Sequence, residues 1–152
     1  MPLHRGFLQL WYNEYMQLRP FPRSLVVLLL AIAIVNAFAN HYYWYWTMRW
    51  FDAPMHFSAG VWLAGTAIWF RFFSGRFEGV SKSLGVFMKW GIGVAFGVGF
   101  GWEVYKAIVG LITKGHINAM SDTFSDLSFD ILGAVFLAIV IWMKEKNNLK
   151  IV

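Results

Sequence analysis

The sequence predicts an all-α integral membrane protein with four transmembrane helices and an interfacial helix at its N-terminus. Of its 152 residues, 59% are hydrophobic and only 14% are charged, and the mean hydropathy is +0.52. A soluble domain of this length needs a larger polar share to cover its surface. Four apolar stretches are candidates to cross a bilayer. We therefore expect one membrane domain over residues 1–152.

The N-terminal segment, residues 1–22, differs from the apolar stretch that follows it. Its sequence FLQLWYNEYMQL mixes aromatic and polar residues, which is typical of a helix lying in the membrane interface. The first span is expected at about 24–46, from the apolar run SLVVLLLAIAIVNAFA to the aromatic cluster HYYWYW. Aromatic side chains at this density favour an interfacial belt, and they also offer a platform for a lipid or a sugar.

The triplet AFA at 37–39 fits the small-residue pattern of a signal-peptide cleavage site. The segment before the apolar run is too long for the charged region of a signal peptide and carries its own aromatic helix. We therefore expect this run to remain as the first span.

Three further spans are expected at about 53–71, 86–112 and 122–143. The sequence SGRFEGVSKSLG at 74–85 separates the second from the third, and its glycines and serines predict a loop. We find no internal repeat.

The third span contains the glycine-rich sequence GIGVAFGVGFG, in which Gly93, Gly97 and Gly101 recur every four residues. A dinucleotide-binding loop needs a strand before the glycines and a helix after them, and that context is missing. The spacing instead predicts a helix face that packs closely against a neighbour.

Lysine and arginine predict the orientation of the spans. Ten of the thirteen lie in the N-terminal segment, around the loop between spans two and three, or at the C-terminus. The other three are Arg49, Lys106 and Lys114. Both termini are therefore expected in the cytoplasm. Topology accounts for the net charge of +5, and with no basic helix or patch we expect no nucleic-acid partner.

The acidic residues have the opposite distribution. Five of the eight lie at or near the predicted outer ends of spans two to four, and a histidine joins them: Asp52, His56, Glu103, Asp122, Asp126 and Asp130. From Ile131 to Met143 the fourth span reaches only about 20 Å of a ~30 Å hydrocarbon core. The span must therefore take Asp126 and Asp130 into the membrane, and we expect Glu103 and His56 at a similar depth.

Several of these residues also have simpler explanations. Asp52 precedes Ala-Pro and could cap a helix. Asp122 and Asp126 suit the first turns of a helix, and Thr123 with Asp126 fits a capping box. Lys106 could neutralise Glu103 three residues earlier, and His56 alone could be a packing histidine. Asp130 lies two turns further into the span, and an intramembrane carboxylate favours a functional role.

Three blocks resemble a known group of proteins: FDAPMHFSAG at 51–60, GWEVYK at 101–106 and DTFSDLSFDILGA at 122–134. They resemble small, mostly uncharacterised bacterial inner-membrane proteins with, or near, the VanZ-like group linked to glycopeptide resistance. The resemblance covers spans two to four and implies a multi-pass protein of the inner (plasma) membrane and cell envelope.

The resemblance also implies site residues. Asp52 and His56 match an Asp-x-x-x-His motif, Glu103 matches a glutamate after an aromatic residue, and Asp122 with Asp126 matches Asp-x-x-x-Asp. The VanZ-like variant Asp-x-x-x-Asn-x-x-Gly is matched by Asp126, Asp130 and Gly133, with aspartate replacing asparagine. Lys106 departs from the pattern, because relatives tend to have Glu or Gln there.

The resulting hypothesis is a site at the level of the outer leaflet that binds or acts on an envelope lipid or a lipid-linked head group. The candidate metal ligands are His56, Glu103, Asp122 and Asp126, and the candidate catalytic residues are His56, Glu103 and Asp126; Asp52, Asp130 and Lys106 flank them. Oxygen donors with one imidazole suit Mg²⁺, Mn²⁺ or Zn²⁺, and a chain without cysteine has no thiolate ligand or nucleophile. If no ion binds, the cluster should share protons.

The alternative is a non-catalytic subunit whose acids and aromatics dock other membrane subunits of a larger complex. An ion or proton conductor is disfavoured, because no acid or histidine continues towards the cytoplasmic half. The residues alone leave open whether the protein is an enzyme.

Overall fold

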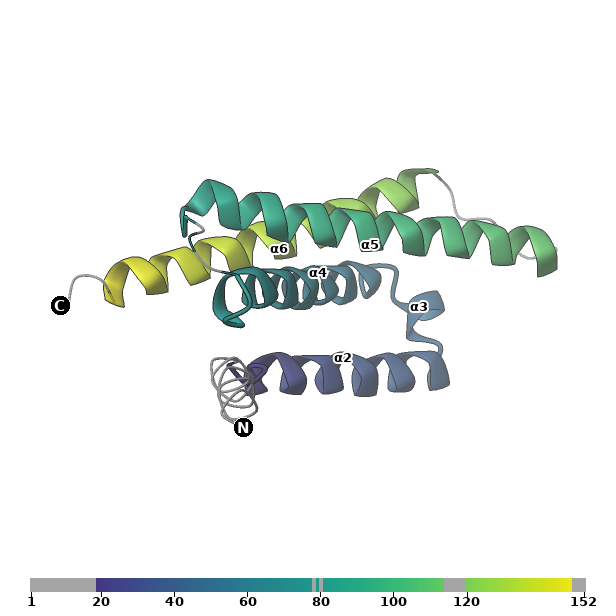
Figure 1. Cartoon of the computed structure of the whole chain (residues 1–152). Helices are drawn as coiled ribbons and strands as arrows, with labels where there is room; N and C mark the ends of the chain where they lie inside the picture. The colour runs from purple at the N-terminus through teal and green to yellow at the C-terminus, as the bar shows by residue number, and fades with distance from the viewer. Residues whose placement is uncertain (1–18, 78, 80, 114–119, 149–152) are drawn as a thin grey trace, which may run out of the picture.

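The computed structural model describes residues 19–77, 79, 81–113 and 120–148, and within these ranges the chain is helical with no strand. The all-α prediction is therefore confirmed. Residues 1–18, most of the predicted interfacial helix, lie outside the described residues. The elements, shown in Figure 1, are α2 (Arg23–His41), α3 (Trp44–Thr47), α4 (Asp52–Ile68), the π-helical turn η1 (Trp69–Phe73), α5 (Leu84–Thr113) and α6 (Met120–Asn148).

Three of the described helices are long and apolar enough to cross a membrane, namely α2, α5 and α6. The second predicted span differs from them. Its α-helix α4 has 17 residues and continues directly as the five-residue π-helical turn η1. The described residues therefore contain three long apolar helices where the sequence predicted four.

The first span ends earlier than predicted, at His41 instead of residue 46. Tyr43 has φ 58°, a left-handed conformation that stops the helix and turns the chain. The aromatic cluster then packs on the buried ring of Phe51, which Trp44 and Tyr45 meet edge-on at 5.3 and 5.2 Å between centroids. Burial of Phe51 favours this turn over a longer α2.

The central helix of the bundle is α4, which packs against α2, α5 and α6. Small residues permit the close approach. A Cβ atom on Gly60 would collide with the backbone carbonyl of Asp130, and one on Gly133 would collide with the carbonyl of Phe57. The backbones of α4 and α6 therefore touch at this crossing, as in other membrane helix pairs that meet at small residues.

The packing face of α5 differs from the predicted one. A Cβ added to Gly93, Gly97 or Gly101 meets nothing within 4 Å, so these glycines do not form the close helix contact. The buried face has the same four-residue spacing in another register: Gly91, Ala95, Gly99 and Glu103. As predicted, α5 packs through a face of small residues, but the predicted glycines were the wrong ones. The face that packs also contains Glu103.

The bundle interior changes character along its length. At the end formed by η1 and the start of α5, the core contains Ile68, Phe72 and Phe87. In the middle of the bundle, the buried core consists of one alanine each from α4, α5 and α6. At the opposite end, α5 and α6 bury carboxylates, namely Glu103, Asp126 and Asp130. In Figure 1, α2 and α5 begin and α4 and α6 finish at the left, so the carboxylate end lies to the right.

Candidate functional site

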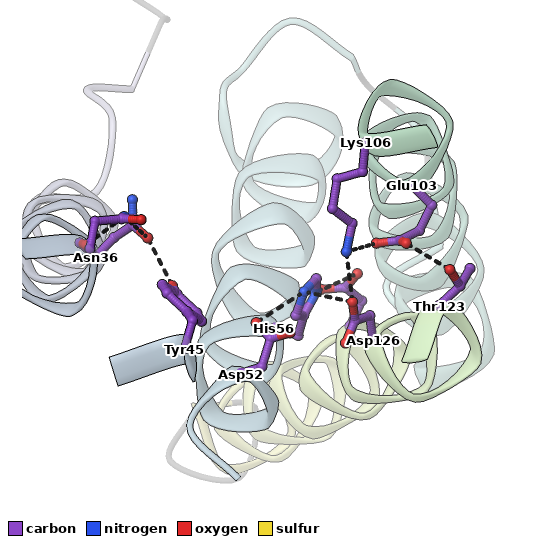
Figure 2. A network of polar contacts seen from close by, with 10 residues as sticks. Asn36, Tyr45, Asp52, His56, Glu103, Lys106, Thr123 and Asp126 are labelled. Atoms are coloured by element: carbon purple, nitrogen blue, oxygen red, sulfur yellow. Dashed lines mark hydrogen bonds and ion pairs between the residues drawn. The ribbon is translucent and has the colours of Figure 1, made fainter. Parts of the chain in front are cut away.

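Three helices supply a cluster of polar residues at one end of the bundle, and each contributes two side chains from one face. Residues three or four apart lie one turn apart on a helix, so each pair projects in the same direction. The pairs are Asp52 and His56 from α4, Glu103 and Lys106 from α5, and Asp126 and Asp130 from α6. Figure 2 labels all of them except Asp130.

His56 is the centre of this cluster. Its Nδ1 lies 3.3 Å from both carboxylate oxygens of Asp130. On the other side of the ring, Nε2 lies 3.3 Å from Oδ2 of Asp126 and 3.6 Å from Oδ1 of Asp52. The imidazole thus connects Asp126 and Asp130 of α6 with Asp52, the first residue of α4.

This arrangement restricts the protonation of His56. A neutral imidazole donates from one nitrogen and accepts at the other, and an accepting nitrogen opposite a carboxylate oxygen is repelled. Because both nitrogens face carboxyl groups, the accepting nitrogen needs a proton or a cation: either the imidazole carries a second proton, or a neighbouring carboxyl supplies one, or a cation lies at Nε2. With a cation at Nε2, Nδ1–H would donate to Asp130, and a carboxylate in this position commonly orients a metal-bound histidine.

A second group is centred on Lys106. Its Nζ donates a hydrogen bond of 2.9 Å to Oδ2 of Asp126 and lies 2.7 Å from Oε1 of Glu103 as an ion pair without hydrogen-bond geometry. The other oxygen of Glu103 accepts a 2.9 Å hydrogen bond from the hydroxyl of Thr123. Asp126 therefore links the two groups, because the same oxygen faces both Lys106 and His56.

Asp52, His56 and Asp126 have the spacing of a metal-ligand set. One donor atom from each lies within 4.8 Å of the other two. Two ligands of a tetrahedral ion with bonds of about 2.1 Å are about 3.4 Å apart. The distances of 3.3 and 3.6 Å from Nε2 to the two carboxylates match this separation, and neither contact has hydrogen-bond geometry.

The cluster is open on one side. The side chain of Asp52 is 36% exposed, that of His56 13%, and that of Asp126 4%. Lys106 also retains partial exposure. A ligand that approaches past Asp52 therefore reaches Nε2 of His56 first, while Asp130 lies behind the ring and is buried.

Two features of the helix contacts hold Asp130 behind the ring. Gly99 on α5 provides its space, because a Cβ there would collide with an Asp130 carboxylate oxygen. The Asp130 backbone also rests against Gly60 of α4. Neither contact follows from a motif, and both depend on the register of three helices.

The structure brings together six of the seven residues singled out from the sequence and leaves out Asp122. Asp122 is exposed in the first turn of α6, and no described polar contact involves it. Glu103 contacts Lys106 and Thr123, and it is absent from the group with metal-ligand spacing.

The first-turn explanation holds for Asp122, whereas Asp52 and Thr123 make contacts other than the expected caps. Asp52 is the first residue of α4, and the N-cap position before it has no side-chain cap. The helix α6 begins at Met120, so Thr123 lies inside it and bonds to Glu103. The sequence offered no sign of that bond, because a threonine at a helix start is more simply explained as a cap.

A smaller polar contact lies beside the cluster. The Tyr45 hydroxyl donates 2.8 Å to Oδ1 of Asn36, and Asn40 donates to the backbone carbonyl and Oδ1 of the same residue (Figure 2). These groups are exposed, and they join the last turns of α2 to α3 next to the open side of the site. The aromatic cluster was predicted only as a belt, whereas the structure gives Tyr45 a hydrogen-bonding role as well.

The fold and the site define a helical membrane protein with a buried histidine–carboxylate cluster at one end. Residues 7–147 match the family described as Predicted membrane protein (DUF2238), so the chain belongs to that family. The match supports an uncharacterised membrane protein family and does not support the VanZ-like assignment drawn from the short sequence blocks. No curated protein and no solved structure matches the chain.

Proposed function

We propose that the protein is a four-span inner-membrane protein with both termini in the cytoplasm and the histidine–carboxylate cluster at the outer-leaflet level. The continuous helical segment of α4 and η1, residues 52–73, would serve as the fourth span with α2, α5 and α6. About 20 residues of helix suffice to cross a bilayer. The basic residues near η1, at the start of α2 and at the end of α6 favour the cytoplasm for that end.

At the opposite end, the proposed activity is binding of a divalent cation by Asp52, His56 and Asp126. The single observation that carries this proposal is the position of His56 Nε2, at 3.6 and 3.3 Å from two carboxylates that do not hydrogen-bond to it. Two carboxylates and one imidazole suit Mg²⁺, Mn²⁺ or Zn²⁺. Asp130 would orient the imidazole from behind, and Glu103 would keep Lys106 beside Asp126.

The cation would in turn bind a phosphate of an envelope lipid or lipid-linked head group. Four carboxyl groups face one lysine and one histidine in the cluster, so the acids outnumber the bases and the site alone disfavours an anion. A divalent cation bound by three protein ligands would make the site locally attractive to an anion. It would also leave coordination positions for phosphate oxygens. Lys106, Asn36 and the exposed aromatics Trp46 and Trp50 would then lie near the head group.

The test compares Asp126 with Asp122, which lies one turn before it on α6. Mn²⁺ is titrated into the purified protein by calorimetry, for the wild type and for Asp126→Asn and Asp122→Asn. We expect one bound ion per chain, at least about tenfold weaker binding in Asp126→Asn, and unchanged binding in Asp122→Asn, because only Asp126 is within reach of His56 Nε2. Equal binding by all three proteins would refute the site.

The lipid step has its own measurement. Retention of an undecaprenyl-phosphate or phosphatidylglycerol probe is compared in Mn²⁺ and in EDTA. The proposal requires binding that depends on the ion and is lost in Asp126→Asn. If the probe binds equally in EDTA, the head-group proposal is wrong even where the cation site stands.

A further inference from the structure

The opposite end of the bundle contains an arginine cluster, formed by Arg19, Arg71 and Arg76. The buried Ser74 hydrogen-bonds to the backbone of two of them, Arg19 and Arg76. Ser74 is 2% exposed and directly follows η1. Its hydroxyl donates 2.6 Å to the Phe70 carbonyl and accepts a 3.3 Å hydrogen bond from the Arg76 backbone N–H. Its own carbonyl accepts 3.0 Å from the Arg19 backbone N–H. Ser74 therefore joins the segment before α2 to the loop after η1.

Arg71 lies within the π-helical turn that leads to this serine. Its guanidinium carbon is 4.5 Å from the ring centre of Phe77 and 5.6 Å from that of Trp90. Its Nη1 atom is buried and has no hydrogen-bond partner. A buried charged donor without an acceptor is unfavourable, so a missing partner for this atom is expected to be an anion. Short π-helical segments often occur at functional sites.

The neighbouring aromatic rings bring a second guanidinium to the same surface. Phe70 and Phe77 meet edge-on at 5.6 Å between centroids, and Arg76 lies 5.5 Å from the Phe70 ring centre. Both rings are more than two-fifths exposed, as is Trp90. The surface therefore combines charged donors with exposed aromatic rings, which is typical of a protein–membrane interface.

The described carboxylates do not neutralise this cluster. None forms an ion pair with Arg19, Arg71 or Arg76, and the ion pair near this end joins Lys82 to Glu145 at 3.6 Å. Arginine binds phosphate through paired N–H donors, and basic sites between membrane helices bind anionic head groups.

We propose that Arg19, Arg71 and Arg76 form a binding site for the phosphate of an anionic phospholipid in the leaflet at this end of the bundle. The exposed Arg19 and Arg76 donate to the phosphate from the loop side, the buried Nη1 of Arg71 reaches a phosphate oxygen once its side chain turns outwards, and Phe77 and Trp90 contact the glycerol and upper acyl region. This site does not depend on the cation site at the other end. It would hold a structural or regulatory lipid of the opposite leaflet.

Native mass spectrometry of the full-length protein in detergent tests the site, with phosphatidylglycerol and phosphatidylcholine of identical acyl chains as probes. Each arginine near a lipid phosphate contributes about fivefold in affinity. We expect the wild type to prefer phosphatidylglycerol, and both Arg71→Gln and Arg19→Gln to lose roughly fivefold for that lipid alone. All proteins are measured in EDTA, so that the cation site at the other end is empty. The matched control is then Arg49→Gln, an exposed arginine after α3 at that other end, which should change nothing.

Arg19→Gln keeps the test decisive if Arg71→Gln does not fold, because the Arg19 side chain is exposed and lies outside the helices. Wild-type phosphatidylglycerol binding by Arg19→Gln and by any folded Arg71→Gln would overturn the proposal. An equal loss in Arg49→Gln would also overturn it, because the effect would then be non-specific charge. Full competition by inorganic phosphate would show that the arginines select a free anion and not a lipid.

Discussion

Removing the ammonium of Lys106 should destabilise the protein far more than removing that of another paired lysine. In Lys106→Met, the carboxylates of Glu103 and Asp126 lose the cation that lies 2.7 and 2.9 Å away. Both acids are under 10% exposed, so their charges remain in a poorly solvated site. Breaking a buried ion pair from one side costs about 3–5 kcal/mol.

The expected cost is at the lower end of this range, about 3 kcal/mol, because the Lys106 side chain keeps 25% of its exposure. The matched control is Lys82→Met. Its ion pair with Glu145 is longer, at 3.6 Å, and the two side chains are 44% and 29% exposed. Pairs of that kind contribute at most about 1 kcal/mol.

The assay is the thermal unfolding midpoint in detergent with EDTA, followed by tryptophan fluorescence at one scan rate. For a chain of this length, about 3 kcal/mol corresponds to roughly 6–12 °C, against at most about 4 °C for Lys82→Met. Adding Glu103→Gln to Lys106→Met should raise the midpoint again, because one unpaired charge is removed. If Lys106→Met lowers the midpoint no more than Lys82→Met, the acids are not buried charges held by Lys106.

Three further outcomes are expected. Gly99→Ala should weaken Mn²⁺ binding, because its Cβ would occupy the space of the Asp130 carboxylate. The control Gly97→Ala faces open space and should bind Mn²⁺ normally. Equal affinities of the two variants for Mn²⁺ would contradict the helix register. Asp130→Asn should keep one ion per chain but weaken its binding about 10–100-fold, as loss of an orienting partner does; a loss of stoichiometry would make Asp130 a ligand instead. Reporter fusions after Gly79 and Arg49 should report the cytoplasmic and outer sides, and the reverse pattern would invert the proposed topology.

The helical class could be predicted from composition because each long apolar run has few ways to satisfy its backbone in a membrane other than a helix. Boundaries were less predictable where tertiary contacts decide them. Hydropathy carries the first span through the aromatic cluster, but burial of Phe51 turns the chain at Tyr43. A π-helical turn at Trp69 likewise has no hydropathy pattern of its own.

The site was partly predictable because depth follows from residue counts along a helix. That argument selected His56, Glu103 and Asp126 at one level, and their helices bring them into one connected cluster. The depth of a residue in the membrane does not say which way its side chain points. Asp122 shares the four-residue spacing of Asp126 and Asp130 but lies beyond the α4 contact, and the glycines of α5 fit two registers equally well from sequence alone.

The most direct test of the central claim is electron spin echo spectroscopy of the protein loaded with one equivalent of Mn²⁺. The account predicts nuclear modulation from a single imidazole nitrogen, because His56 is the one histidine among the three proposed ligands. This modulation should disappear in His56→Gln and persist in His41→Gln, a histidine at the end of α2. Bound Mn²⁺ without nitrogen modulation, or modulation that survives in His56→Gln, would contradict the proposed cation site.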